Sequence, residues 1–343
     1  MVMHMSVSTN KFWENKRVLV TGGAGFVGSW LSYELAAQGA HVVILDIKPA
    51  MPLLGEPYDR ILNKSVLVRG DVRDASLLHT LFVQYTFDTV FHLAAHALVD
   101  DVLAYPHEAL DTNIMGTVRV LEESRMHHGV RVVVASSDKA YGVHQTLPYK
   151  EHFPLLGENH PYDCSKSCAD QIARMYAQVY KLPVAVARCG NIYGGGDLNF
   201  SRIIPGTIQA LLHEKPIELR SDGSYRRDYV YIQDVLSAFL CSAEHLAYGK
   251  ISGEAFNFGH NKPLRVLEVV DIISQLMNKT HLKPIVLNTT KNEIPNQYLD
   301  ASKSRSVLGW QPQYDVEKGL GETIELYKFY FQRTGFIQNQ SYL

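Results

Sequence analysis

A glycine-rich turn near the N-terminus constrains the fold of this chain more than any other segment. Gly22, Gly25 and Gly28 follow the β-branched run Arg17–Thr21 and precede a stretch with helical spacing of apolar residues. Together with Gly23 they satisfy both the GxGxxG and the GxxGxxG spacing. Glycines at these positions allow a tight turn and let backbone N–H groups approach a pyrophosphate at the start of a helix. The pattern therefore predicts a strand, a phosphate-binding loop and a helix, in that order.

An acidic residue at the end of the next apolar run indicates which dinucleotide such a loop would bind. Asp46 follows the glycines by about 20 residues, the offset of a carboxylate that accepts hydrogen bonds from ribose hydroxyls. The same carboxylate repels a 2′-phosphate, so we expect NAD rather than NADP, although Lys48 lies close by. Two later strand ends, Gly70–Val72 and Leu93–Ala95, would reach the adenine and allow close approach of the dinucleotide. The residues expected to contact NAD are Gly22, Gly25, Phe26, Val27, Gly28, Asp46, Ile47, Asp71, Val72, Leu93, Ala94, Ala95, Asn113, Ser136, Tyr162 and Lys166.

Short apolar runs alternate with helical stretches over the first half of the chain. The runs are nearly continuous in Val, Ile and Leu, as expected of parallel strands that are covered on both faces. Repeated strand–helix–strand connections predict an α/β fold with a Rossmann-like, doubly wound parallel sheet. The expected strands are Arg17–Thr21, His41–Asp46, Ser65–Arg69, Thr89–Leu93, Val130–Ser136 and Pro183–Arg188.

The second half predicts a smaller α/β lobe for the substrate. Its expected strands are short and scattered, at Pro216–Leu219, Asp228–Tyr231 and Ala255–Phe258, before a terminal helix near Val316–Phe331. Because there is no low-complexity linker, the lobes are expected to share a rigid interface with a cleft between them. The expected division is a flexible segment over 1–15, an NAD-binding domain over 16–190 with returns from 228–260, a discontinuous substrate-binding lobe over 191–335, and a tail over 336–343.

Composition excludes several classes of protein. The 343 residues include 33 basic and 35 acidic side chains, a net charge of −2, so the chain has no basic stripe for nucleic-acid phosphates. The apolar runs are far shorter than the ~20 residues that span a bilayer, and residues 1–16 lack the apolar stretch of an export signal. No histidine falls in an HExxH or paired Cys/His spacing, and no cysteines form a CxxC pair. We therefore expect no nucleic-acid or membrane partner, no metal, a cytoplasmic location, and free thiols at Cys164, Cys168, Cys189 and Cys241.

A tyrosine and a lysine one helical turn apart are the candidate reactive groups. Tyr162 and Lys166 would lie on one face of a helix, downstream of a strand that ends at Ser136 and Ser137. A nearby ammonium and a positively charged nicotinamide would both stabilise the phenolate and lower the tyrosine pKa. Tyr162 is therefore a candidate base for an alcohol whose carbon loses a hydride.

Together these features resemble the extended short-chain dehydrogenases/reductases, and within them the NAD-dependent nucleotide-sugar epimerases and dehydratases. The shared motifs are the TGGAGFVGS start, the Gly-Asp-Val turn, the Ser-Ser strand end and YxxxK, followed later by Arg-Cys-Gly-Asn-Ile-Tyr-Gly and Phe-Asn-Phe-Gly. The resemblance covers the chain from Lys16 to about Phe331. It implies a cleft with NAD on one side and a nucleoside-diphosphate sugar on the other.

The resemblance also assigns residues to the substrate and implies a partner. It implies that Asn191 and Arg227 contact the substrate diphosphate, that Arg202 lies near the nucleotide, and that Asn257 belongs to the same site. It further implies a homodimer in which two helices pair across the dimer axis, near residues 109–127 and 162–179.

The triplet Ser137, Asp138 and Lys139 indicates the reaction. In the 4-epimerases of the family the positions after the active hydroxyl residue are typically small or unreactive, whereas 4,6-dehydratases have an acid and a base there. Asp followed by Lys is the form of the CDP-glucose 4,6-dehydratases, which the stretch Asn191–Pro205 also resembles. The stretch Arg226–Tyr229 keeps the generic form, so the nucleotide base stays open. The resemblance implies a lyase that converts an NDP-hexose, such as CDP-glucose, to the NDP-4-keto-6-deoxy-hexose.

A mechanism for that reaction uses each residue once. Tyr162 would take the O4 proton as C4 gives its hydride to tightly bound NAD, and Ser137 would hydrogen-bond the oxyanion. Lys139 would remove the C5 proton and Asp138 would protonate the departing C6 hydroxyl, before hydride return to C6 regenerates the cofactor. A neutral lysine beside a protonated aspartate requires a dry pocket, so both side chains are expected to face the closed cleft. The alternative is a 4-epimerase, which needs only Ser137, Tyr162 and Lys166; a regulatory dinucleotide-binding protein and a reductase using free NADPH are further alternatives.

Overall fold

The chain divides into two units, each assembled from separate segments. The computed structural model describes residues 11–48, 58–97, 99–289 and 293–334. The first unit draws on the ranges 1–140, 157–187 and 239–255, and the second on 141–156, 188–238 and 256–343.

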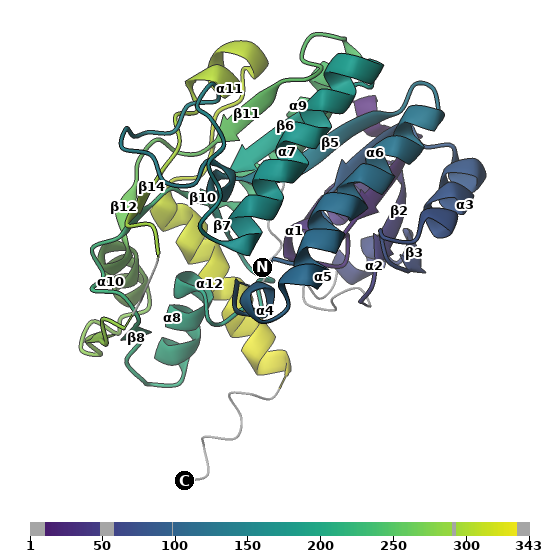
Figure 1. Cartoon of the computed structure of the whole chain (residues 1–343). Helices are drawn as coiled ribbons and strands as arrows, with labels where there is room; N and C mark the ends of the chain where they lie inside the picture. Colours follow the sequence, from purple (N-terminus) through teal and green to yellow (C-terminus); the bar gives the residue numbers. More distant parts are fainter. Residues whose placement is uncertain (1–10, 49–57, 98, 290–292, 335–343) are drawn as a thin grey trace. The chain divides into compact units, whose positions relative to one another are not determined.

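A seven-stranded sheet forms the centre of the first unit (Figure 1), although residues 188–189 and 256–258 of two of its strands are assigned to the second unit. Its strands are β1 (Arg17–Thr21), β2 (His41–Asp46), β3 (Val66–Arg69), β4 (Thr89–His92), β5 (Arg131–Ser137), β6 (Val184–Cys189) and β11 (Ala255–Phe258). They run in the order β11-β6-β5-β4-β1-β2-β3, and β1 pairs in parallel with both β2 and β4. Because the strand order reverses at β1, the sheet is doubly wound, and ligands of such sheets bind beyond the carboxyl ends of the strands at this point.

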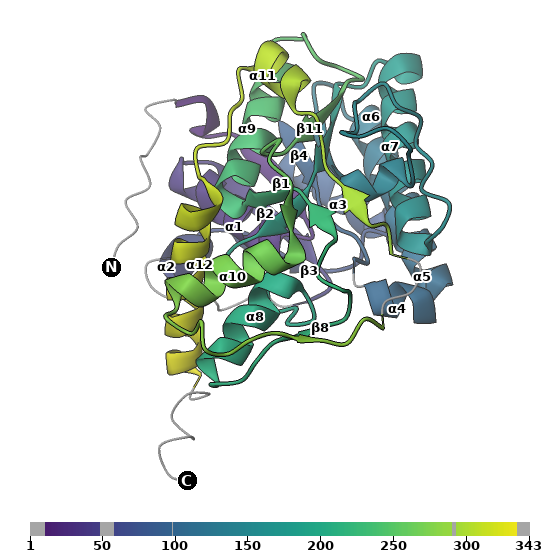
Figure 2. The same cartoon turned by 90° about the vertical axis from the view of Figure 1, so that its left-hand side faces the viewer.

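Helices cover both faces of this sheet. Figure 2 shows α1, α2 and α9 on one side of the strands and α3, α6 and α7 on the other. Leu81 and Phe82 of α3 and Leu121 of α6 pack on Leu19 and Val90 of the sheet in one buried apolar cluster. The helices are α1 (Phe26–Ala37), α2 (Tyr58–Leu62), α3 (Ala75–Tyr85), α4 (Val99–Ala104), α5 (Pro106–Leu110), a π-helical turn (Asp111–Met115), α6 (Gly116–Met126), α7 (Pro161–Tyr180) and α9 (Ile232–Ala247), with 3-10 turns at Lys11–Trp13 and Asp138–Tyr141.

The doubly wound parallel sheet is confirmed, and the six strands expected in the first half are present with ends within one residue of the predicted ones. One detail of the expectation was wrong. β3 is an edge strand whose Val66 and Leu67 are 43% and 44% exposed, so it is not covered on both faces. The segment Ala255–Phe258, which lies in the range 228–260 expected to return to the NAD-binding domain, joins the large sheet as β11, where all four of its residues are buried.

Short strands and four longer helical segments make up the second unit. β7 (Asn191–Tyr193) pairs with β10 (Tyr229–Tyr231), β9 (Arg226–Arg227) lies between β12 (Leu264–Arg265) and β14 (Asn296–Gln297), and β8 (Glu218–Leu219) pairs with β13 (Ile285–Val286). The helices are α8 (Ile203–Leu212), α10 (Val266–Leu276), α11 (Ser302–Leu308) and α12 (Val316–Arg333). None of the helices in the described part of the chain has the length and apolar content to cross a membrane.

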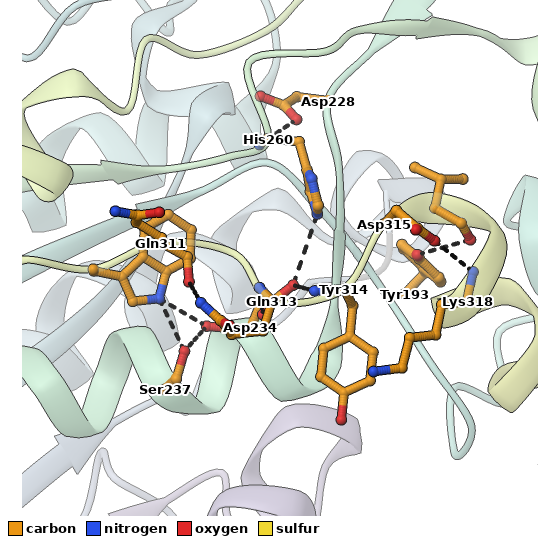
Figure 3. Close-up of polar contacts among 12 residues, drawn as sticks. Tyr193, Asp228, Asp234, Ser237, His260, Gln311, Gln313, Tyr314, Asp315 and Lys318 are labelled. Carbon is orange, nitrogen blue, oxygen red and sulfur yellow. Dashed lines mark hydrogen bonds and ion pairs between the residues drawn. The ribbon is translucent and has the colours of Figure 1, made fainter.

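A buried carboxylate at the start of α9 holds the segment before α12 (Figure 3). Asp234 is 1% exposed and accepts hydrogen bonds from the N–H groups of Gln313 (2.7 Å) and Tyr314 (3.3 Å). Nε2 of His260 lies 3.7 Å from Asp234 Oδ2. Burial raises the pKa of Asp234 to about 6, whereas the two N–H donors act in the opposite direction. These bonds explain why a carboxylate lies in the core of this unit. The carboxylate accepts hydrogen bonds from backbone N–H groups that would otherwise be buried without a partner.

Candidate active site

The glycine turn after β1 is closed so tightly that side chains would not fit. Gly22 has a φ of +68°, and a Cβ on it would lie 2.7 Å from the backbone N of Ala94. A Cβ on Gly28 would lie 2.1 Å from the carbonyl oxygen of Gly22. α1 begins after Gly25 without a side-chain cap, so the N–H groups of its first turn, including those of Phe26 and Val27, face the turn as an anion-binding end. This cradle fits a pyrophosphate.

Asp46, at the end of β2, is fixed against the same turn. Its Oδ2 accepts the N–H of Ala24 and its Oδ1 the N–H of Lys48, each at 3.0 Å. Both oxygens retain further lone pairs for hydroxyl donors. The neighbouring Ile47 is 57% exposed. The arrangement fits a ribose better than a ribose phosphate, because the carboxylate is held at the edge of the phosphate cradle.

The side chains at the other strand ends expected to contact the cofactor differ in whether they are already paired or buried. The carboxylate of Asp71 is paired with Arg73 at 2.7 Å; burial opposes its ionisation, but the bonds and charge of Arg73 outweigh burial and hold the Asp71 pKa below its usual value. Val72 is 4% exposed and faces the core. After β4, the N–H of Leu93 donates to the Thr21 carbonyl at 3.1 Å, which keeps the segment Leu93–Ala95 beside the glycine turn.

A serine on β5 supplies further evidence for a bound group. The Oγ of Ser136 is buried and has no hydrogen-bond partner in the part of the chain that the structure describes. Buried hydroxyls are almost always paired, so an unpaired one beside a ligand site marks a contact that the ligand completes. With the glycine cradle and Asp46, Ser136 makes the first unit a fit for NAD.

The candidate reactive groups come from the end of β5 and the start of α7, both in the first unit. Ser137 Oγ donates to Asp138 Oδ1 at 3.1 Å and accepts the N–H of Lys139 at 3.2 Å. Asp138 is only 1% exposed. Lys166 Nζ donates to the Ala135 carbonyl at 2.9 Å and lies 5.9 Å from the centre of the Tyr162 ring. The hydrogen bond to β5 fixes the ammonium of Lys166 near the phenol, as a base with a lowered pKa would require.

A residue that the sequence reasoning missed joins this group. Asp163 follows the tyrosine in the first turn of α7 and is 8% exposed. It shares a helix face with Ser167, whose Oγ donates to the Ala140 carbonyl at 2.6 Å, so this face of α7 lies against the turn that contains Asp138 and Lys139. Burial raises the pKa of Asp163 to about 6; the charge of Lys139 lowers it and that of Asp138 raises it further. Its only signal in the sequence was its place beside the tyrosine.

We expect Asp163→Asn to stabilise the protein at neutral pH. An aspartate titrates near 3.9 in an unfolded chain, so between that pH and about 6 the native state binds more protons and stability falls as the pH rises. Asparagine removes this loss, so the variant should exceed wild type by roughly 1–3 kcal/mol above pH 6.5 and by almost nothing at pH 4. Urea unfolding at both pH values measures the difference. The exposed Asp271→Asn is the control, and a constant difference across this pH range would contradict the assignment.

A chain of buried hydrogen bonds links the glycine turn to α7. His92 is 3% exposed; its Nδ1 lies 2.8 Å from Thr21 Oγ1 and its Nε2 2.9 Å from Thr117 Oγ1. The Thr117 hydroxyl donates to the Asn113 carbonyl at 2.6 Å, so Nε2 must carry the imidazole proton and Nδ1 must accept from Thr21. Burial, reinforced by the charge of Lys166, lowers the pKa of His92 to about 3.

Asn113 completes that chain. Its Oδ1 accepts the N–H of His96 at 2.7 Å, and its Nδ2 donates to the His96 carbonyl at 3.2 Å and to Ser165 Oγ at 2.8 Å. Ser165 in turn donates to the Tyr162 carbonyl at 2.8 Å. The amide expected to contact NAD is thus engaged with protein groups, and it positions the start of α7 relative to the segment after β4.

The neutral His92 predicts a loss of stability in acid. An unfolded histidine takes up a proton below about pH 6.5, whereas the buried one does so only near pH 3. Stability is therefore complete above pH 6.5 and falls by up to about 1.4 kcal/mol per pH unit as the pH drops toward 3. His92→Asn should be less stable at pH 7.5, by about 1–3 kcal/mol, because the threonine hydroxyls lose partners. Its loss of stability between pH 6.5 and 5, followed by urea unfolding, should be smaller than that of wild type; parallel curves would contradict the prediction.

The residues expected to bind substrate lie in the second unit. Arg227 is 4% exposed and pairs with Glu293 at 2.6 Å, and Arg202 pairs with Asp197 at 2.9 Å while its side chain is 43% exposed. Asn191 begins β7 and donates its N–H to the Asp228 carbonyl at 2.7 Å.

Asn257 differs from these residues. It is fully buried, its Oδ1 accepts the Tyr141 hydroxyl at 2.7 Å, and its Nδ2 donates to the carbonyls of Tyr149 and Asp300. Its amide therefore links three segments of the second unit, which is a structural role.

The chain is similar to known proteins over most of its length. Residues 18–259 match the model of the NAD dependent epimerase/dehydratase family. The chain is 32% identical over 336 residues to the CDP-glucose 4,6-dehydratase of Salmonella typhimurium, with 92% of each protein covered. It is 30% identical to the UDP-glucose 4-epimerase of Halalkalibacterium halodurans, covering 87% of this chain and 91% of that protein. The dTDP-glucose 4,6-dehydratase of Streptomyces venezuelae, solved with NAD bound, has a TM-score of 0.80 and 30% identity, covering 92% of this chain and 98% of that one.

Proposed function

The chain belongs to the NAD dependent epimerase/dehydratase family, and we propose that it is a nucleotide-sugar 4,6-dehydratase, a hydro-lyase that converts an NDP-hexose to the NDP-4-keto-6-deoxy-hexose. The observation that supports this reaction is the buried Asp138 followed by Lys139 at the end of β5, in the same unit as Tyr162 and Lys166. An acid and a base are needed for elimination of water and serve no purpose in a 4-epimerase. CDP-glucose is the first substrate to test, because the Asp-Lys pair and the 32% identical relative both favour it.

Side chains of the first unit are proposed to carry out the proton transfers of this reaction and to stabilise the charge that develops. Bound NAD would supply the acceptor for the C4 hydride and its return to C6. Tyr162 removes the O4 proton with the Lys166 ammonium nearby to stabilise the phenolate, and Ser137 donates a hydrogen bond to the oxygen as charge develops on it. The resulting ketone acidifies C5–H, so that Lys139 removes that proton and Asp138 protonates the departing C6 hydroxyl.

Cofactor and substrate are proposed to be held by different units. In the first unit, the glycine cradle, Asp46 and Ser136 would hold NAD tightly through the whole cycle, since no step consumes it. In the second unit, Asn191, Arg202 and Arg227 are proposed to bind the nucleoside diphosphate of the substrate. Two arginine side chains at the site suffice to bind an anionic diphosphate. The protein therefore needs no excess of basic residues, and its net charge is −2.

Mass spectrometry of products in deuterated water tests the reaction. Incubation with CDP-, dTDP-, GDP- and UDP-linked hexoses should give a product lighter by one water and carrying one deuterium at C5. A product of unchanged mass with inverted C4 would instead establish the alternative, a 4-epimerase, which the 30% identical UDP-glucose 4-epimerase supports. Binding of NAD without turnover of any of these sugars would favour a regulatory protein.

We also propose a homodimer in the cytoplasm. Apolar side chains on and beside α6 and α7 remain exposed, among them Met115 (43%), Met175 (38%) and Val179 (60%). Pairing of these helices between two copies would bury them. None of the four cysteines, all of which the structure describes, forms a disulfide, and a reducing compartment would keep them so. Elution as a monomer in gel filtration would contradict the dimer.

A further inference from the structure

Three side chains from two helices converge on the surface of the first unit, away from the residues assigned to the reaction. His79 lies on α3, Glu123 lies in the last turns of α6, and His127 caps that helix. Glu123 Oε1 lies 2.9 Å from His79 Nδ1 and 3.1 Å from His127 Nε2. The three candidate ligand atoms all lie within 4.8 Å of one another.

The cluster is partly shielded and partly ordered by its surroundings. The side chains of Glu123 and His127 are 16% and 26% exposed, whereas that of His79 is 67% exposed. The ring of His127 packs against the fully buried Phe82, with 5.4 Å between ring centres and 43° between ring planes, so the imidazole is held against the core. Two ligands are therefore held in place and the third is free to adjust.

The chemistry of this trio matches that of a metal site. Two imidazoles and one carboxylate, with a fourth position left to water, is a recurrent ligand set for Zn²⁺. Zinc–ligand bonds of about 2.0–2.2 Å in tetrahedral geometry place ligand atoms about 3.3 Å apart, so the two contacts of Glu123 Oε1, at 2.9 and 3.1 Å, need shifts of only a few tenths of an ångström. The two imidazole nitrogens lie within 4.8 Å of each other, and movement of the exposed His79 would bring them to the required separation. Glutamate and histidine at i and i+4 on one helix face are already aligned for a shared ion.

We propose that His79, Glu123 and His127 form a binding site for a transition-metal ion of the Zn²⁺ type. The ion would take the place of the hydrogen bonds between the two imidazoles and the carboxylate. It would thereby cross-link α3 and the end of α6. The ligand set of nitrogen and carboxylate oxygen favours Zn²⁺, Cu²⁺ and Ni²⁺ over Mg²⁺ and Ca²⁺. None of the three residues has a part in the proposed reaction, so the site would act on stability and not on chemistry.

The sequence did not indicate this site, and the expectation of no metal rested on motif spacing alone. Glu123 and His127 form an ExxxH pair, which is common on helix surfaces, and the third ligand lies 44 residues earlier in the chain. Only the packing of α3 beside α6 brings His79 to them.

Calorimetric titration of untagged, EDTA-treated protein with ZnCl₂ tests the proposal directly. We expect one Zn²⁺ per chain at pH 7.5, and a rise in Tm of about 5 °C or more when Zn²⁺ exceeds its Kd by 100-fold. MgCl₂ should give neither. With CoCl₂, the visible absorption should develop without the near-ultraviolet band of thiolate ligation, which excludes Cys164 and Cys168 as the binding groups.

Variants then assign the site. His79→Ala and Glu123→Gln should each weaken Zn²⁺ binding at least 10-fold and abolish the Tm shift. The exposed His128→Ala, next to the cluster but outside it, should bind as wild type does. Because His79 is largely exposed, its replacement should leave NAD binding and the Tm of the metal-free protein unchanged, which separates loss of a ligand from loss of fold. Absence of Zn²⁺ binding to the wild type, or full binding by His79→Ala, would overturn the proposal.

Discussion

Replacing Lys139 with methionine should lower the rate of water loss by about 10²- to 10⁴-fold, the usual contribution of a general base. Methionine keeps the length and apolar stem of lysine but has no amine to accept the C5 proton. Deuterium incorporation at C5 should fall by the same factor, because exchange and elimination share this proton transfer. Product mass and C5 labelling in deuterated water, measured on the same samples, give both rates.

The two rates separate the base from the acid. If water loss slows while C5 exchange continues, Lys139 assists the leaving group and is not the base. Lys64→Met, at an exposed lysine of the same unit, is the matched control and should behave as wild type. Water loss by Lys139→Met at the wild-type rate would remove the main support for a dehydratase and leave the 4-epimerase as the better proposal.

The charges around Lys139 bear on how it can act as a base. A lysine is neutral only if its environment disfavours the ammonium, and an ionised carboxylate nearby does the opposite. The structure places two carboxyl groups, Asp138 and Asp163, where they interact with one another and with this lysine. Burial raises the pKa of Asp163 to about 6, and the charge of Asp138 adds to the rise. Repulsion between like charges in a buried site disfavours the state in which both carboxyl groups are ionised, and a protonated Asp138 is the form that the acid role requires.

Local signals were sufficient for most of the fold of the first unit. Parallel strands buried on both faces have a continuous apolar run, and the glycine turn fixes where the first strand ends and the first helix begins. The place of Ala255–Phe258 in the sheet was harder to predict, because a run of only four residues, three apolar and one asparagine, suits either sheet. The helix expected over 109–127 is interrupted by a π-helical turn at Asp111–Met115, since Asn113 there bonds to His96 and Ser165. Such a turn depends on tertiary partners that no local pattern reveals.

The candidate site shows the same division between local and non-local information. Tyr162, Lys166 and the Asp138–Lys139 pair have short sequence motifs, and the structure places all four in one unit. Asp163 and His92 have none: their roles follow from the surfaces they face and from burial, which shifts both pKa values by desolvation. Asn113 and Asn257 have a residue type suited to ligand contact, and only the structure reveals the protein hydrogen bonds that their side chains make.

Tyr162→Phe should have an effect as large as that of Lys139→Met but on more steps. Removal of the phenol eliminates the base for the O4 proton, and oxidation at C4 must come before C5–H becomes acidic. Water loss and C5 exchange should therefore both fall about 10²- to 10⁴-fold, with little change in Tm. Lys166 should keep its place, because its bond to the Ala135 carbonyl does not involve the phenol.

The comparison of these two variants distinguishes the family chemistry from the specific reaction. Tyr162→Phe disables a 4-epimerase and a 4,6-dehydratase alike, since both begin with oxidation at C4. Lys139→Met disables only the dehydratase, so an epimerase would lose activity in the first variant and keep it in the second. Tyr180→Phe, at the exposed end of the same helix, is the control. Turnover by Tyr162→Phe within threefold of wild type would show that another group removes the O4 proton, and would contradict the assignment on which both reactions depend.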